Sequence, residues 1–296
     1  MLKVAIFGFG NLGKAAVEAI EAANDLELCG IILRPQSLTK PNLTVPVVDD
    51  ISKLTTKPDV AILCVPTRSV PEVAEKCLAL GINTVDSYDI HTDIWELRNR
   101  LDAAAKAGGA TAVISVGFDP GIDSVVRTLM EAAAPQGKTF TNFGPGKSMG
   151  HTVAVKAIAG VKNALSLTIP LGTGVHRRMV YVEPLEGYNF DDIAAKIKAD
   201  PYFSNDETHV YLEKDVNSLI DVGHGVNITR KGVSGKTHNQ LLEFNMKINN
   251  PALTTQIMIA CARAAAKQTP GAYTIIELPV IDMLEGNKED LVRRLV

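Results

Sequence analysis

The chain has 296 residues, a formal net charge of −3 and an isoelectric point of about 6.1, so it lacks the basic character expected of a nucleic-acid-binding protein. Its 46% hydrophobic and 21% charged residues are typical of a globular protein with a sizeable core, and no run of the sequence reaches the ~20 apolar residues of a membrane-spanning helix. We therefore expect one large or two moderate domains, with no nucleic-acid or membrane partner.

The cysteines are scattered along the chain and form no C-x-x-C pair. They predict buried, reduced thiols and hence a cytoplasmic protein. The short apolar run at the start ends in a glycine turn, which is not the pattern of a signal peptide. The histidines show no metal-ligand spacing, so we expect no metal site.

The first residues predict a dinucleotide site. Residues 2–7 form an apolar β-like run, a turn of the form G-x-G-x-x-G follows, and a helical pattern begins at Lys14. In this motif the first glycine allows the tight turn, the second lets a pyrophosphate approach, and the third lets the helix pack on the strand. The N–H groups at the helix N-terminus then bind phosphate. The predicted contacts are Gly8, Gly10, Asn11, Leu12 and Gly13, and the alternative is a glycine-rich turn without function.

The second predicted strand, residues 26–33, indicates which dinucleotide is bound. An NAD-preferring site carries an acid at the end of this strand, for the ribose 2′-hydroxyl. Here the strand ends in Leu33 and Arg34. An arginine can bind a 2′-phosphate that an acid would repel, so we predict NADP(H). The alternative is that Arg34 is a solvated loop residue.

The next hundred residues alternate between strand and helix patterns. After a proline-rich loop at residues 35–46, a short edge strand is expected at 47–48, further strands at 58–65, 82–86 and 110–115, and helices at 69–80 and 94–107. This alternation predicts an α/β fold with a doubly wound parallel Rossmann sheet in a dinucleotide-binding domain, residues 1–120.

In such a sheet, ligands gather beyond the carboxyl ends of the strands. The predicted strands end in two acids, Asp89 and Asp119, which we expect to face the nicotinamide as candidate catalytic groups. The alternative for each is a turn or helix-cap role. Further cofactor contacts are expected at these strand ends from Cys64, Val65, Pro66, Thr67, Ser87 and Tyr88.

The second half predicts an α+β substrate and oligomerisation domain, residues 121–254, with residues 255–296 packing back on the first domain. We expect helices at 122–134, 152–165, 190–200 and 254–267. Residues 142–151 form a glycine-rich loop that we assign to substrate. Strands are expected on either side of a basic turn within 167–182, and at 222–228 and 241–248.

Two polar residues of this half are candidate substrate contacts. Arg178 can bind a carboxylate through two N–H groups, whereas its neighbour Arg177 is the better candidate for a solvated arginine. His224 lies between two glycines. Because glycines contribute little to the packing of a hydrophobic core, His224 is unlike a core residue. The alternatives are a surface arginine and a turn histidine.

With these stretches in view, the chain resembles the meso-diaminopimelate dehydrogenases over nearly its whole length, and it is most similar to their shorter form with broader tolerance of D-amino acids. The resemblance is carried by G-F-D-P-G at 117–121, T-N-F-G-P-G-K-S-M-G-H at 141–151, G-H-G at 223–225, and residues 64–71, 85–91, 172–180 and 248–251. These motifs are far more specific than the glycine turn.

The resemblance implies oxidation of the D-centre of meso-2,6-diaminopimelate by NADP+. The products would be ammonia and L-2-amino-6-oxopimelate, which cyclises to tetrahydrodipicolinate. The reverse reductive amination would serve lysine biosynthesis, and the enzyme would be a homodimer or higher homo-oligomer. The family's substrate positions fall on Asp89, Asp119, Phe143, Met149, Thr168, Arg178, His224 and Asn250. Phe118, also placed at the substrate, departs from the tryptophan common in the family, and loss of the indole N–H could alter the grip on the substrate carboxylate.

Three other functions compete with this interpretation. A D-amino-acid dehydrogenase of broad range would differ only in substrate. A two-domain sugar or polyol dehydrogenase usually carries Glu-Lys-Pro where this chain has Cys64-Val65-Pro66, without a lysine. A non-catalytic NADP-binding sensor is disfavoured by the charged residues that converge on the strand ends.

Overall fold

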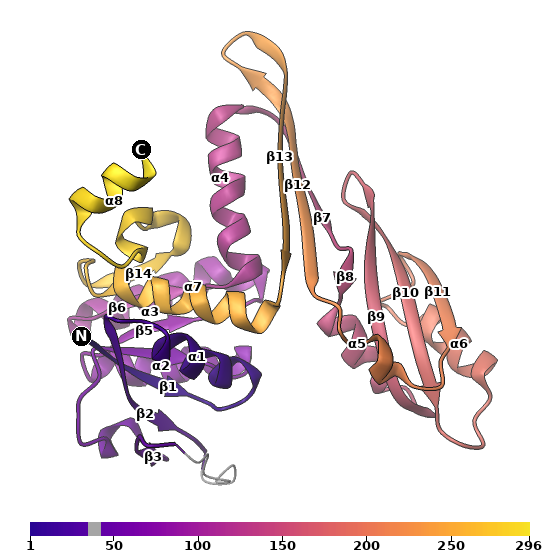
Figure 1. Ribbon diagram of the computed structural model, residues 1–296, viewed down its shortest axis with the longest axis horizontal. Coiled ribbons are helices and arrows are strands. Elements are labelled where there is room, and N and C mark those ends of the chain that lie inside the picture. Colours follow the sequence, from indigo (N-terminus) through magenta and orange to yellow (C-terminus); the bar gives the residue numbers. More distant parts are fainter. Residues whose placement is uncertain (35–42) are drawn as a thin grey trace. The chain divides into compact units, whose positions relative to one another are not determined.

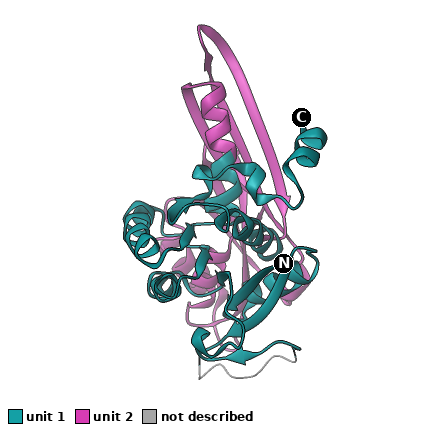
Figure 2. Ribbon diagram, turned by 90° about the vertical axis from the view of Figure 1, so that its left-hand side faces the viewer, with its two compact units in different colours: residues 1–125, 251–296 teal, residues 126–250 magenta. Residues whose placement is uncertain are grey.

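The computed structural model describes residues 1–34 and 43–296, so most of the loop predicted at 35–46 lies outside the described residues. The chain forms two compact units (Figure 2). The first comprises Met1–Val125 and Pro251–Val296, and the second comprises Val126–Asn250.

The first unit is built around a parallel sheet (Figure 1). Its elements are β1 (Leu2–Phe7), α1 (Asn11–Glu21), β2 (Leu26–Ile32), β3 (Val47–Val48), β4 (Val60–Leu63), α2 (Val70–Ala79), β5 (Asn83–Asp86), α3 (Ile94–Gly108), β6 (Thr111–Ile114), most of α7 (Asn250–Ala265), β14 (Gly271–Thr274) and α8 (Lys288–Leu295).

The seven strands follow the order β14-β6-β5-β4-β1-β2-β3, and every pair is parallel. From β1 the chain builds outward through β2 and β3, then returns to the other side of β1 with β4. This reversal makes the β1–β4 boundary the topological switch point, where such sheets bind ligands. The predicted doubly wound fold is confirmed.

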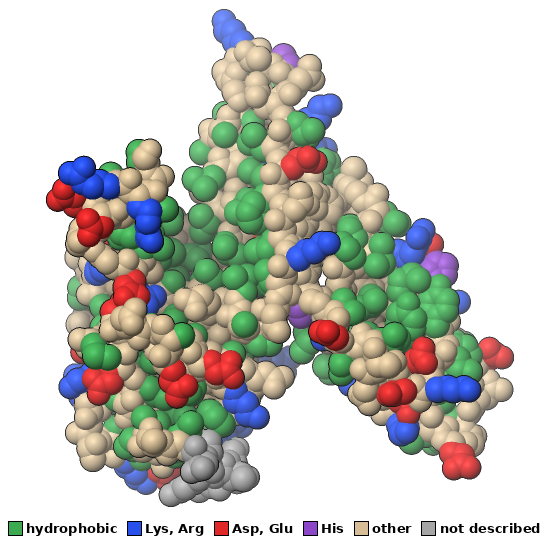
Figure 3. Space-filling model, in the orientation of Figure 1, with side chains coloured by type: hydrophobic (Ala, Val, Ile, Leu, Met, Phe, Trp, Pro, Cys, Tyr) green, Lys and Arg blue, Asp and Glu red, His purple; other side chains and the backbone are tan. Residues whose placement is uncertain are grey.

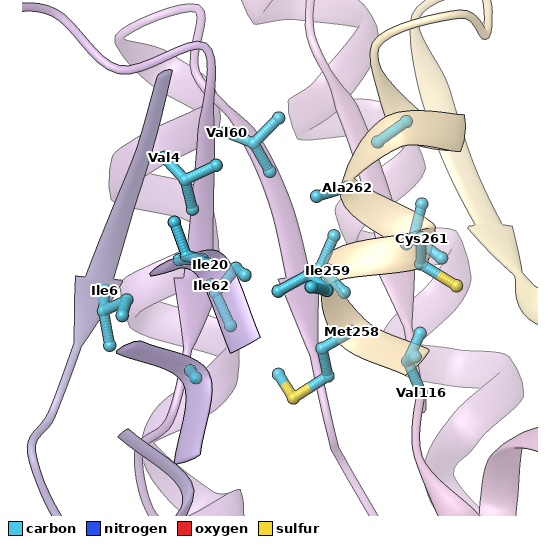
Figure 4. Packing of buried hydrophobic residues seen from close by; sticks show 14 of the residues in the cluster. Val4, Ile6, Ile20, Val60, Ile62, Val116, Met258, Ile259, Cys261 and Ala262 are labelled. Carbon is cyan, nitrogen blue, oxygen red and sulfur yellow. The ribbon is translucent and has the colours of Figure 1, made fainter. Parts of the chain in front are cut away.

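Alternate residues of the central strand enter two separate apolar cores. Val4 and Ile6 point to the face covered by α1 and α7, whereas Ala5 and Phe7 point to the face covered by α2 and α3. Figure 4 shows Met258 of α7 among the residues of the first core. Both faces are therefore buried, which explains why the strands read as continuous apolar runs.

The C-terminal segment completes this unit. Strand β14 adds to the sheet edge beside β6, and the sequence had not indicated this strand. On α7, Arg263 binds Asp25 through two hydrogen bonds of 2.7 Å. The Arg263 guanidinium lowers the pKa of the Asp25 carboxyl chiefly through this contact. The segment thus belongs structurally to the same sheet as the glycine turn.

The second unit contains two sheets. Its elements are α4 (Asp123–Ala133), β7 (Gln136–Phe143), β8 (Gly146–Lys147), α5 (Met149–Lys156), β9 (Val161–Gly172), β10 (Val175–Pro184), α6 (Phe190–Ala199), β11 (Glu207–Leu212), β12 (His224–Ser234) and β13 (Thr237–Ile248). One sheet has the order β11-β10-β9-β8, and its core includes residues of α5 and α6; the other has the order β13-β12-β7.

The helix predicted at residues 152–165 is wrong in its second half. Helix α5 ends at Lys156, and β9 begins at Val161. Gly160 adopts a positive φ of 96°, which suits glycine and separates the two elements. The alanine-rich composition favoured a helix, but pairing with β10 along the whole length of β9 outweighs that local preference.

Buried Arg230 of β12 fastens the end of α4 to its sheet. Its guanidinium donates to the carbonyls of Ala134 and Pro135 at 2.8 and 3.1 Å, and to the Thr139 hydroxyl at 2.7 Å. Carbonyls at a helix C-terminus lack partners within the helix, and a cation there also suits the helix dipole. This arginine is therefore structural.

Candidate functional site

Of the three glycines in the turn after β1, only the middle one has room for a side chain. Gly8 has a φ of 89°, and a Cβ there would lie 2.2 Å from the carbonyl oxygen of Cys64. A Cβ on Gly13 would lie 2.3 Å from the carbonyl oxygen of Gly8. A Cβ on Gly10, by contrast, would have no neighbouring atom within 4 Å. The turn therefore packs tightly on the sheet and leaves open space at the position where a pyrophosphate approaches in this motif.

Helix α1 presents an N-terminus suited to an anion. Gly10 is its N-cap residue, no side chain makes a capping hydrogen bond, and the first turn has no acidic residue. The N–H groups of Asn11, Leu12 and Gly13 belong to the first turn, where the helix itself provides no acceptors. Uncapped N–H groups and the helix dipole together attract phosphate. These residues fit the dinucleotide that the motif implies.

The segment after β4 borders this turn. Cys64 packs against Gly8 and Gly13, and its burial raises the pKa of the thiol to about 12, so it is not a nucleophile. Val65 and Thr67 are half-buried, and Pro66 is exposed. These residues follow the strand beside β1, at the switch point. This segment therefore borders the glycine turn.

Asp89 follows β5 and is exposed. The Thr67 hydroxyl donates a hydrogen bond to its carboxylate at 2.5 Å. This contact links the segment after β4 to the segment after β5. Asp89 is therefore held at the carboxyl edge of the sheet rather than being a loosely solvated side chain.

The other strand-end candidates differ in burial. Tyr88 is 6% exposed and its ring lies in the core on the α2–α3 face, so its backbone and not its ring faces the edge. Ser87 is half-buried. Phe118 is 9% exposed, and Asp119 is half-buried in extended backbone with φ of −147° and ψ of 109°. Arg34 is exposed directly after β2 and Leu33.

In the second unit, a turn between β7 and β8 brings several candidates together. A Cβ on Gly144 would lie 2.1 Å from the Thr168 carbonyl oxygen. A Cβ on Gly146 would lie 2.4 Å from the carbonyl oxygen of Gly223, and one on Gly225 would lie 3.0 Å from that of Gly144. A Cβ on Gly223 would lie 2.5 Å from the Ile248 carbonyl oxygen, so both glycines that flank His224 are needed for close backbone contact. They place His224 against the turn that follows Phe143.

Three candidates continue this arrangement across the four-stranded sheet. Gly146 of β8 is paired with Thr168 of β9, which is paired with Arg178 of β10. The Arg178 side chain is 12% exposed; its Nε donates to Asp206 Oδ2 at 2.6 Å, and its Nη1 donates to the Thr168 hydroxyl. Arg178 is thus an oriented, mostly buried cation. Arg177, beside it, forms an exposed pair with Glu207.

Burial favours the neutral form of two histidines in this cluster. The backbone N–H of Phe143 donates to His176 Nε2 at 2.9 Å, and the two rings lie 6.0 Å apart. Burial, and next the Arg178 charge, lower the pKa of His176. Burial, and next the Lys147 charge, lower the pKa of His224. Arg178 and Lys147 therefore supply the positive charge around these histidines.

The remaining substrate candidates lie at its margins. Met149 begins α5 and is 55% exposed. Asn250 is half-buried and begins α7, immediately after the segment that follows β13. The structure thus groups Phe143, Thr168, Arg178 and His224 in one unit, and groups the glycine turn, Thr67 and Asp89 in the other.

Sequence reasoning missed three polar residues that the structure places beside candidates. Asp86 binds the backbone of the loops that carry Asp89 and Asp119. Asp206 binds Arg178. His151 contacts the hydroxyl of Ser148 through Nδ1 at 2.7 Å. Of these, only Asp86 could have been identified from the sequence. It ends an apolar strand, where burial of a carboxylate costs free energy and therefore needs an explanation.

Among residues 1–34 and 43–296, no cluster of three His, Cys, Asp or Glu side chains could hold a metal ion. Nor does any helix in these ranges combine the length and apolarity needed to cross a membrane.

Comparison with known proteins identifies relatives of the whole chain. The family model described as the diaminopimelic acid dehydrogenase C-terminal domain matches residues 117–177, and the model described as a CoA binding domain matches residues 1–87. A meso-diaminopimelate D-dehydrogenase of Bacteroides fragilis is 59% identical over 297 aligned positions, covering 100% of this chain and 99% of the relative.

Solved structures agree with this relationship. The Corynebacterium glutamicum DAP dehydrogenase in complex with DAP has a TM-score of 0.87 and 30% identity, covering 100% of this chain and 99% of the other. An engineered D-amino acid dehydrogenase bound to NADP+ has a TM-score of 0.81 and 30% identity, with the same coverage.

Proposed function

Because the chain belongs to the meso-diaminopimelate D-dehydrogenase family, we infer that it oxidises meso-2,6-diaminopimelate in lysine biosynthesis. It is an NADP-dependent oxidoreductase of the kind that its full-length relatives represent. The observation that carries this conclusion is the similarity to a known family member along the entire chain.

The reaction converts an amine to a ketone. The D-carbon loses a hydride to the cofactor, the resulting imine takes up water, and ammonium leaves, so that diaminopimelate, NADP+ and water give L-2-amino-6-oxopimelate, ammonium, NADPH and a proton. When bound, NADP+ supplies the hydride acceptor. The chain must therefore hold both substrate ends, admit one water and accept a proton.

We assign NADP(H) to the turn after β1. The open space at Gly10 and the uncapped N-terminus of α1 support a pyrophosphate there. Arg34, exposed at the end of β2, would bind the 2′-phosphate. The backbone of the segments 64–67 and 87–88 would line the cofactor at the carboxyl edge of the sheet.

Substrate charge determines the remaining roles. Diaminopimelate carries two ammonium and two carboxylate groups, so its site needs acids as well as cations. Asp89 and Asp119 would bind the reacting amino group, and either could pass its proton through a water molecule. Arg178 would bind a carboxylate, because its guanidinium is already oriented by Thr168 and Asp206. Phe118, Phe143, Met149, His224 and Asn250 would complete the substrate contacts.

The two halves of the chain would bind different molecules. We assign residues 1–120 to the dinucleotide and 121–254 to substrate and oligomerisation. Figure 3 shows hydrophobic side chains gathered over α4 and the β12–β13 hairpin, where Leu129 is 64% exposed and Leu241 is 58% exposed. Such exposed apolar residues favour a homodimer or higher homo-oligomer. Four free cysteines are consistent with the cytoplasm.

The test is direct. Purified protein is incubated with NADP+ and meso-diaminopimelate, and the absorbance of NADPH is followed. We expect reduction with the meso isomer and none with the LL isomer, which lacks a D-centre. NAD+ in place of NADP+ should give a much slower rate. A panel of other D-amino acids measures substrate breadth, and absence of NADPH with every substrate would favour the non-catalytic sensor.

A further inference from the structure

Asp86, the last residue of β5, is completely buried at the carboxyl edge of the first unit's sheet. Its Oδ1 accepts two backbone hydrogen bonds, from the N–H of Tyr88 at 2.9 Å and from the N–H of Ser115 at 3.0 Å. Its own carbonyl accepts a third, from the N–H of Val116 at 2.8 Å. One residue therefore joins the segments that follow β5 and β6.

Those two segments carry the acids assigned to the amino group. Tyr88 immediately precedes Asp89, and Ser115 opens the segment that leads to Asp119. The strands run side by side, with Val85 paired with Val113. Because both hydrogen bonds go to one oxygen atom, they fix the distance between the first residues of the two loops.

The backbone at Ser115 supports the same conclusion. Ser115 has a φ of 58°, in the left-handed region that non-glycine residues rarely adopt. Such a conformation persists only where surrounding contacts enforce it. The hydrogen bond from its N–H to Asp86 is one of those contacts, so removal of the carboxyl group would let the segment leading to Asp119 relax.

A carboxyl at this position is costly for the fold itself. Burial raises the pKa of Asp86 to about 6, although the N–H groups of Ser115 and Tyr88 act against this rise. In the part of the chain that the structure describes, Oδ2 finds no hydrogen-bond partner. An apolar residue would avoid this cost but would leave the N–H groups of Tyr88 and Ser115 without their acceptor. The acid is therefore explained by the two loops that it joins.

We propose that Asp86 is a positioning residue, whose Oδ1 fixes the spacing of the loops bearing Asp89 and Asp119 so that both carboxylates reach one ammonium group. A second contact serves the same end on the other side, because the Thr67 hydroxyl holds the Asp89 carboxylate. The inference rests on the function proposed above, in which these two acids bind the reacting amino group.

The proposal is tested by moving the Oδ1 acceptor. Asp86→Asn keeps an oxygen at this position, and Asp86→Glu displaces it by one methylene. We expect Asp86→Asn to retain a KM for diaminopimelate within about threefold of wild type. We expect Asp86→Glu to raise that KM and lower kcat by about 10-fold or more, because shifts of ~1 Å in catalytic geometry carry costs of this order. The dissociation constant of NADP+, measured by calorimetry, should change much less than this KM in both variants, because the assigned phosphate contacts lie at the glycine turn and at Arg34.

Thr84→Val is the matched control. Thr84 lies two residues earlier on the same strand, is fully buried, and has a hydroxyl without a partner among the described residues. It bonds neither loop, so its kinetic constants should match those of wild type. If Asp86→Glu behaves like this control, the positioning role is wrong.

Two further outcomes separate the inference from its premise. A wild-type enzyme without diaminopimelate-dependent NADPH formation would overturn the proposed function itself. An active wild type, with equal KM values in the Asn and Glu variants, would overturn only the role of Asp86. Should Asp86→Glu fail to fold, Asp86→Ser takes its place; its shorter side chain also withdraws the acceptor, and the same rise in KM is expected.

Discussion

Arg178 and Asp206 form a mostly buried ion pair beside Thr168, with Nε donating to Oδ2 at 2.6 Å. The Thr168 hydroxyl accepts a hydrogen bond from Nη1, whereas Nη2 makes no hydrogen bond to any described residue. A substrate carboxylate would therefore meet a cation that is already fixed in direction, and binding would cost little side-chain entropy.

Replacement of Arg178 by Ala should raise the KM for diaminopimelate about 30-fold or more, since removal of one partner of a mostly buried charge pair costs about 2 kcal/mol or more. The KM for NADP+ should not change. Steady-state kinetics measures both constants. Arg177→Ala is the control, because this neighbour forms only an exposed pair with Glu207 and such pairs contribute little. Equal effects of the two substitutions would remove Arg178 from the site.

Asp119→Ala should sharply lower turnover with meso-diaminopimelate while NADP+ binding stays intact, because the acid is assigned to the reacting amino group and not to the cofactor. We expect a loss of about 100-fold or more, the range for a group that assists proton transfer. Turnover and calorimetric NADP+ binding are measured on the same preparation. Unchanged turnover would leave Asp119 with a turn role only.

Arg34→Ala should weaken binding of NADP+ and leave that of NAD+ nearly unchanged, because only NADP+ carries the 2′-phosphate. We expect a drop of about 10-fold, as for the loss of one charge-assisted hydrogen bond. The Michaelis constants of both cofactors with the same variant provide an internal control. A parallel loss for both cofactors would indicate a general effect on the loop, and no loss would show that Arg34 is solvated.

The buried carboxyl of Asp86 should make stability depend on pH. Its folded pKa, about 6, lies above its ordinary value of 3.8, so the folded state holds the proton more tightly than the unfolded state. Stability should therefore fall as pH rises from about 4 to about 6, by up to about 3 kcal/mol for this group. Denaturant unfolding across this range measures the effect. The Asp86→Asn variant cannot titrate there and should lose this part of the slope, whereas an unchanged slope would mean that Asp86 titrates normally.

Much of the first unit could be read from local patterns. Apolar runs bounded by turns predicted its strands, and the glycine spacing at Gly8, Gly10 and Gly13 predicted a turn that the structure shows to be closed around Cys64. These features are legible because a parallel strand buried on both faces must be apolar throughout. Strand β14 was missed because its few residues gain their place only by pairing with β6.

The elements of the second unit were predicted less accurately from the sequence, because its strands form only where a neighbouring strand pairs with them. Residues 161–165 have a helical composition, yet they form the start of β9 because β10 lies beside them. The flanking glycines of His224 suggested an unusual position, but only the structure shows that Gly225 admits the Gly144–Gly146 turn and that Gly223 admits the Ile248 carbonyl.

The sequence by itself determined the doubly wound sheet, the place of the glycine turn and the family, because periodicity, glycine spacing and motif identity are properties of neighbouring residues. Only the tertiary structure decided that Asp206 orients Arg178, that Thr67 holds Asp89, and that Asp86 ties two loops together. Apart from the bond between Asp86 and Tyr88, these contacts join segments that belong to or flank different strands. Their partners are set by sheet order and register, which no local pattern of residues specifies.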